Sequence, residues 1–149
     1  MTSLERSLAL ARQLLQEAEE LAEAQHDANG ERSSRAEEGF ARLDVELSRW
    51  FGAEGYHFMV ARTVVRAREE HPLLRRGDAA AAATMQEVVR ALRDLPPAAA
   101  NDLRLRLLMT FIAQLDRLLG PELATRLVTR AWWHGTESKA LPFDQRTHE

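Results

Sequence analysis

The chain has 149 residues, a formal net charge of −3 at pH 7 and no cysteine. Its length predicts a single domain with a hydrophobic core of its own, and the missing cysteines exclude disulfides, thiolate zinc sites and cysteine nucleophiles. The near-neutral charge gives no reason to expect nucleic acid as a partner.

Membrane and export signals are not found in the sequence either. The longest stretch without a charged residue is nine residues long, 107–115, whereas about 18–20 apolar residues are needed to cross a bilayer. The first residues do not combine a basic segment with an apolar core, so we expect no signal peptide. Arginine supplies nineteen of the twenty basic residues, which is typical of a GC-rich bacterial genome. The expected location is the bacterial cytoplasm, with no membrane partner.

The first predicted helix spans about residues 2–26. Thr2 and Glu5 are spaced as a capping box, in which each side chain binds a backbone N–H of the first turn. The apolar residues behind it repeat at heptad spacing, namely Leu4, Leu8, Ala11, Leu15, Ala18 and Ala22. Such a seam predicts packing within a bundle or, alternatively, a homodimer formed through this helix.

Two further helices are predicted on either side of a glycine-containing break. Ser34 and Glu37 are spaced as a second capping box, which opens a helix at about residues 34–51. Glycines at positions 52 and 55 end that helix. The next helix, at about residues 54–70, is apolar over most of its circumference, which predicts that it is buried on nearly all sides.

Three more helices are predicted at about residues 79–94, 98–119 and 121–134. Asp78 is the expected N-terminal cap of the first of them. The helix at 98–119 is the most apolar segment of the chain, so we expect it to be either the central core helix or an oligomer interface. The residues predicted to form the core are Val64, Leu108, Phe111, Ile112 and Leu127.

Together these patterns predict an all-α fold. Residues 1–135 are expected to form one bundle domain of about six helices joined by short loops. We expect the last helix to end at His134-Gly135. Residues 136–149 have little periodicity, which predicts a flexible C-terminal tail.

A candidate partner-binding face lies near the end of the last predicted helix. Arg126, Arg130 and Trp133 are spaced four and three residues apart, so they share one helix face, whereas Trp132 points elsewhere and can belong to the core. Arginine and tryptophan are enriched at interface hot spots, which favours a docking role for this face. The alternative is that Trp133 lies under the C-terminal tail.

A candidate ligand pocket is suggested by the aromatic residues around the break. Trp50, Tyr56 and His57 could line a pocket between helices, although they could also fill a helix–helix corner, with His57 partly buried. Glu54 and His57 have the Glu-x-x-His spacing of di-iron bundles, but such sites need two copies and two further glutamates. We therefore expect no metal site and no cofactor; the alternative is a metal site at Glu54 and His57 in which a dimer supplies the second copy.

The sequence also lacks the common nucleotide-binding, zinc-protease and serine-hydrolase motifs. The sequence does not decide whether the protein is an enzyme, but the missing motifs favour a protein without catalytic activity. The leading hypothesis is a non-enzymatic regulatory module that self-associates, for example as a homodimer, or docks on a protein partner. The alternative hypothesis is a ligand-binding bundle with its pocket near Trp50, Tyr56 and His57.

Overall fold

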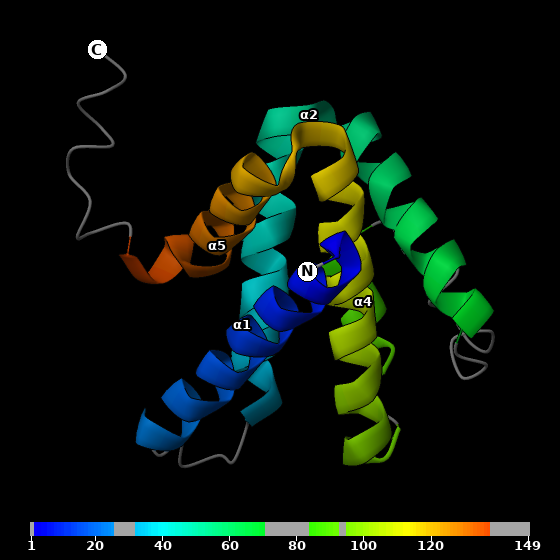
Figure 1. Cartoon of the computed structure of the whole chain (residues 1–149). Coiled ribbons are helices and arrows are strands. Elements are labelled where there is room, and N and C mark those ends of the chain that lie inside the picture. Colours follow the sequence, from blue (N-terminus) through cyan, green and yellow to red (C-terminus); the bar gives the residue numbers. More distant parts are fainter. Residues whose placement is uncertain (1, 26–31, 71–83, 93–94, 138–149) are drawn as a thin grey trace.

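The computed structural model describes residues 2–25, 32–70, 84–92 and 95–137. These residues form five α-helices packed into one bundle, which confirms the predicted all-α class (Figure 1). The helices are α1 (Ser3–Gln25), α2 (Arg32–Glu70), α3 (Met85–Arg90), α4 (Pro97–Leu119) and α5 (Pro121–Glu137). Within this part of the chain, no helix combines the length and the apolar character needed to cross a membrane.

The long helix α2 is bent at Gly52, inside the predicted break. Gly52 has φ 79° and ψ 159°, a backbone conformation that only glycine adopts readily. The two helices expected on either side of the break are therefore the two halves of α2, and the second half turns back along the bundle (Figure 1). Because α2 begins at Arg32, Ser34 lies inside the helix, and the prediction that Ser34 opens it is wrong.

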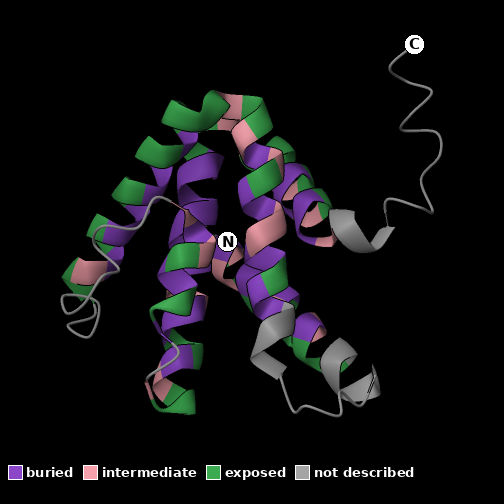
Figure 2. Ribbon diagram, turned by 180° about the vertical axis from the view of Figure 1, so that it is seen from behind, coloured by how far each residue is buried: buried purple, intermediate pink, exposed green. Residues whose placement is uncertain are grey.

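The second half of α2 is buried on one side only, contrary to the prediction. Its inner face carries Val60, Val64 and Ala67, which are buried. Phe58 and Val65 point outward and are exposed, and Figure 2 shows this half with a buried inner side and an exposed outer side. The apolar outer residues are therefore available to form another contact, and they are not part of the core.

Helix α3 is shorter than the predicted helix at 79–94. Thr84 has an extended backbone, with φ −132° and ψ 160°, so a continuous helix cannot pass through it. Thr84 accepts a hydrogen bond from the backbone N–H of Glu87 at 3.2 Å and is the N-terminal cap of α3. The expected cap Asp78 and residues 79–83 lie outside the described residues.

Helix α4 supplies much of the core. Leu108, Phe111 and Ile112 are buried, and Val64 and Leu127 pack into the same cluster, which confirms the five predicted core residues. Gly120, with φ 89°, ends α4, and α5 starts at Pro121. The prediction that α5 ends at His134-Gly135 is wrong, because the helix continues to Glu137. The remainder of the expected tail, residues 138–149, lies outside the described residues.

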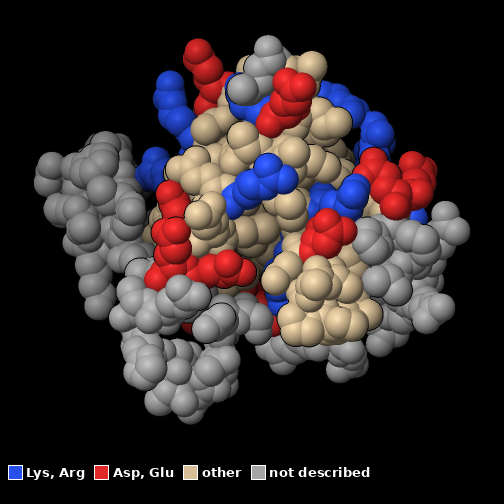
Figure 3. Space-filling model, turned by 60° about the horizontal axis from the view of Figure 1, so that its bottom comes forward, with Lys and Arg blue, Asp and Glu red and all other residues tan. Residues whose placement is uncertain are grey.

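One face of the molecule carries charged side chains of both signs. Figure 3 shows basic and acidic residues interspersed on the face that it presents, without a broad field of one sign.

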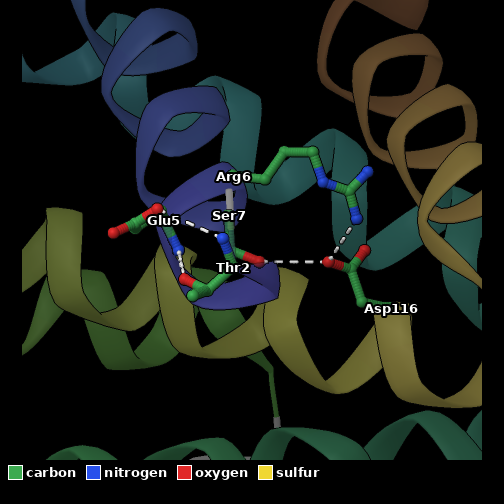
Figure 4. Close-up of polar contacts among 5 residues, drawn as sticks. All are labelled: Thr2, Glu5, Arg6, Ser7 and Asp116. Atoms are coloured by element: carbon green, nitrogen blue, oxygen red, sulfur yellow. Dashed lines mark hydrogen bonds and ion pairs between the residues drawn. The ribbon is translucent and has the colours of Figure 1, made fainter.

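The start of α1 is fixed to α4 by polar contacts (Figure 4). Thr2 and Glu5 form the predicted capping box. The backbone nitrogen of Thr2 lies 3.1 Å from Oε1 of Glu5, and the backbone nitrogen of Glu5 lies 3.0 Å from Oγ1 of Thr2. Arg6 and Ser7 each donate to Oδ2 of the buried Asp116 at 3.2 Å. The buried stripe of α1 is Ser7, Ala11, Leu14 and Ala18, so the predicted seam is wrong in part: Leu4 is exposed, and Leu8 and Leu15 are only half-buried. The burial of Ala22 lies outside what the structure describes.

Candidate functional site

The predicted partner face on α5 is only partly exposed. Arg126 and Arg130 are exposed, whereas Trp133 is half-buried and packs against the core. Arg126 also lines a shallow depression of about 680 Å³ between α1 and α5, together with Arg6 and Leu10. Trp132 is fully buried, as predicted. The three residues thus share a helix, but the indole of Trp133 contributes as much to packing as to the surface.

The structure does not bring Trp50, Tyr56 and His57 together into a pocket. Trp50 is 58% exposed, whereas Tyr56 is only 2% exposed. His57 is exposed too, so the expectation of a partly buried histidine is wrong. The reason is geometric: adjacent helix positions point about 100° apart, and the bend at Gly52 separates Trp50 from the other two residues.

Glu54 and His57 both lie on the surface of α2. Within the part of the chain that the structure describes, no group of three or more histidine or carboxylate side chains is arranged to hold a metal ion. The di-iron arrangement considered for these two residues needs a second Glu-x-x-His pair and two further glutamates, and the described residues do not supply them.

Tyr56 belongs to a buried polar junction that the sequence reading missed. Its hydroxyl donates to the carboxylate of Asp44 on the first half of α2. Asp44 also accepts the backbone N–H groups of Met85 at 2.9 Å and Gln86 at 3.0 Å. Burial raises the pKa of the Asp44 carboxyl, while these three hydrogen bonds act to lower it. Asp44 therefore joins both halves of α2 to the start of α3.

A different concave site lies next to the predicted pocket, between the second half of α2 and the end of α4. We call it the α2/α4 groove; its volume is about 460 Å³. Phe58 and Leu118 stand at this groove, each 62% exposed. The residues that line it are Phe51, Gly55, Phe58, Met59, Arg62, Gln114, Arg117 and Leu118.

The polar floor of the groove is bonded within the protein. Gln114 Nε2 donates to the backbone carbonyl of Met59 at 3.3 Å and also to the hydroxyl of Thr63. The Thr63 hydroxyl in turn donates to the same carbonyl at 2.9 Å. Because the Gln114 amide is already bonded, a binding partner would meet mainly apolar side chains in the groove.

Two arginines stand beside these apolar side chains. The Arg62 guanidinium carbon lies 5.7 Å from the ring centroid of Phe58, within the range of a cation–π contact. Arg117 extends from α4 and is exposed. Among the described residues that line the groove there is no aspartate or glutamate, so these residues carry a positive charge although the whole chain is slightly negative.

The helical spacing of residues 51, 55, 58 and 62 is a signal that could have indicated one wall of the groove. They recur at intervals of four, three and four residues, which places them along one helix face. The opposite wall comes from α4, more than fifty residues later in the chain. Comparison with protein-family models, curated proteins and solved structures gave no match.

Proposed function

We propose that this protein is a non-enzymatic docking module that binds a protein partner in the α2/α4 groove. The observation that carries the proposal is the pair Phe58 and Leu118, which present large apolar side chains to solvent at one concave site. Clustered exposed apolar residues of this kind mark interaction surfaces more often than isolated ones do. Burying them against a partner would gain free energy from the hydrophobic effect.

The lining of the groove supports binding in preference to catalysis. Its polar side chains are Arg62, Gln114 and Arg117. Arginine stays protonated, and the amide of Gln114 is already bonded to Met59 and Thr63, so neither type supplies a nucleophile or a general base at neutral pH. The proposal places this interaction in the bacterial cytoplasm, which cell fractionation can test.

The face of Arg126, Arg130 and Trp133 stays a second proposed docking surface. Both arginines are exposed, but Trp133 packs against the core, so a Trp133→Ala variant would confuse lost binding with lost stability. An Arg126→Glu/Arg130→Glu variant is the cleaner test of this face.

The test compares partner capture by variants that keep their fold. The groove variant is Phe58→Ser/Leu118→Ser, and the control is Val45→Ser, which changes an exposed apolar residue of α2 that does not line the groove. We expect the wild-type and control proteins to capture the same partner and the groove variant to lose it. If only the Arg126→Glu/Arg130→Glu variant lost the partner, the proposed docking site would lie on α5 and not in the α2/α4 groove.

Native mass spectrometry of the untagged protein distinguishes the remaining hypotheses. If the groove binds a protein partner, we expect the mass of the purified protein to show no bound small molecule. A bound organic molecule lost on Phe58→Ser/Leu118→Ser would instead support the ligand-binding alternative, with its site moved from Trp50 and His57 to the groove.

A further inference from the structure

We infer that the segment bound in the α2/α4 groove is an acidic amphipathic helix of a different protein. Its apolar face would cover Phe58 and Leu118, and its carboxylates would pair with Arg62 and Arg117. This inference rests on the proposed function and adds the chemistry of the partner to it.

The shape of the groove suits a helix. Its walls are two helices, so a helix laid between them would extend the bundle by the same side-chain packing that holds the bundle together. On α2, residues 55, 58 and 62 span about two turns, or roughly 10 Å along the axis. Recognition of an amphipathic helix in an apolar groove uses anchors at i, i+3 or i+4, and i+7, which fit this length.

The positive charge at the groove favours acidic residues on either side of the apolar face of that helix. Within the described part of the chain, neither Arg62 nor Arg117 forms an ion pair, and no carboxylate lines the site. The Arg62 guanidinium lies within cation–π range of the Phe58 ring, and a guanidinium has five N–H donors that can pair with a carboxylate. A basic helix would place like charges together, which opposes both encounter and binding.

The same two arginines argue against a second copy as the occupant. If this face paired with itself about a two-fold axis, the arginines of both copies would come together. Outside the groove, the exposed large hydrophobic residues lie on α1, α2 and α5; they are Leu4, Val45, Trp50, Val65 and Leu123. The like charges of the paired arginines favour a separate protein as the occupant.

The inference is tested by selecting binders from a displayed library of helical peptides about five turns long. The library keeps leucines along one face and allows acidic, neutral or basic residues at the flanking positions. Selection uses the full-length protein, and counter-selection uses Phe58→Ser/Leu118→Ser. Circular dichroism confirms that each variant is folded, which we expect because both residues are exposed.

We expect the selected peptides to be rich in aspartate and glutamate. Their Kd should rise on the order of tenfold for Arg62→Glu/Arg117→Glu, and replacing the peptide carboxylates with lysine should restore binding to that variant. Arg90→Glu, an exposed arginine of α3 outside the groove, is the matched control and should leave the Kd unchanged.

The other outcomes separate this inference from the proposed function. Groove-dependent peptides that are neutral or basic would overturn the acidic partner and keep the docking site. A library that yields no peptide dependent on Phe58 and Leu118 would overturn both. A dimer in sedimentation velocity that dissociates on Leu118→Ser would make a second copy the occupant and overturn the inference of a different protein.

Discussion

The indole of Trp132 occupies the space that a side chain at position 39 would need. A Cβ atom built on Gly39 would lie 2.5 Å from Cε2 of Trp132, closer than real contacts allow. The same indole packs edge-on against Phe40, with ring centroids 5.2 Å apart, and Arg42 Nε donates to the Trp132 carbonyl at 2.6 Å. The absence of a side chain at Gly39 therefore sets how closely α2 and α5 approach.

This contact predicts a large difference between two glycine substitutions. Gly39→Ala should lower the free energy of unfolding by about 1–3 kcal/mol or more, because the new methyl group overpacks the helix crossing. Gly55→Ala is the control, since its Cβ would meet only Phe51 at an ordinary 3.5 Å, and alanine gains up to about 1 kcal/mol of helix propensity. Urea unfolding measures both variants. Equal stability of the two would contradict the close contact.

The single tyrosine of the chain gives a direct test of the buried junction. Burial and the neighbouring Asp44 carboxylate raise the pKa of Tyr56 far above its ordinary value. We expect no phenolate absorbance from the folded protein as the pH passes about 10, the pKa of an exposed tyrosine. In denaturant the same phenol should titrate near that value. A normal titration in the folded protein would show that Tyr56 is accessible.

The raised pKa of Tyr56 also predicts how stability depends on alkaline pH. The protonated phenol stabilises the folded state, so this contribution is complete below about pH 10 and is lost as the pH rises further. Tyr56→Phe removes the titrating group, and its stability should fall less steeply over this alkaline range than that of the wild type. Thermal unfolding at a series of pH values provides the comparison.

Removal of the Asp44 carboxylate should weaken the attachment of α3. Asp44→Ala leaves the Tyr56 hydroxyl and the backbone N–H groups of Met85 and Gln86 without their acceptor. Each buried donor left without a partner costs about 1–3 kcal/mol, so we expect a total loss on the order of 3 kcal/mol in urea unfolding. Thr84→Ala, which removes only the local cap, should cost about 1 kcal/mol. A smaller loss for Asp44→Ala than for Thr84→Ala would contradict the proposed role of the junction.

Core and groove residues should respond differently to truncation. Leu108→Ala and Phe111→Ala remove fully buried side chains and should each cost about 2–5 kcal/mol. Leu118→Ala, on the exposed side of α4, should change the stability by no more than about 0.5 kcal/mol. Chemical denaturation of the isolated protein measures all three. A destabilising Leu118→Ala would mean that this residue packs within the fold and is not free for docking.

Features that depend on neighbouring residues could be predicted from the sequence. The Thr2 and Glu5 capping box is local, and the apolar density of residues 98–119 predicted a helix that is either the central core helix or an oligomer interface. The Gly120-Pro121 boundary likewise follows from residues that end one helix and begin the next.

Features that depend on distant residues could not be predicted in the same way. Asp44 is polar, so its position in the pattern gave no sign that α3, some forty residues later, buries and bonds it. Phe58 and Val65 are apolar, yet only one face of the second half of α2 meets the bundle. The α2/α4 groove needs walls from both helices, and periodicity along one segment indicates only one of them.

The backbone conformation of Gly52 also determines whether the bundle can close within a single chain. Without the bend, α2 would be a rod of 39 residues, roughly 58 Å long, and its second half would point away from α3 and α4. A residue at position 52 that favours a straight helix would therefore expose Val60, Val64 and Ala67. Covering those side chains with α3 and α4 of another copy would give the geometry of a domain swap.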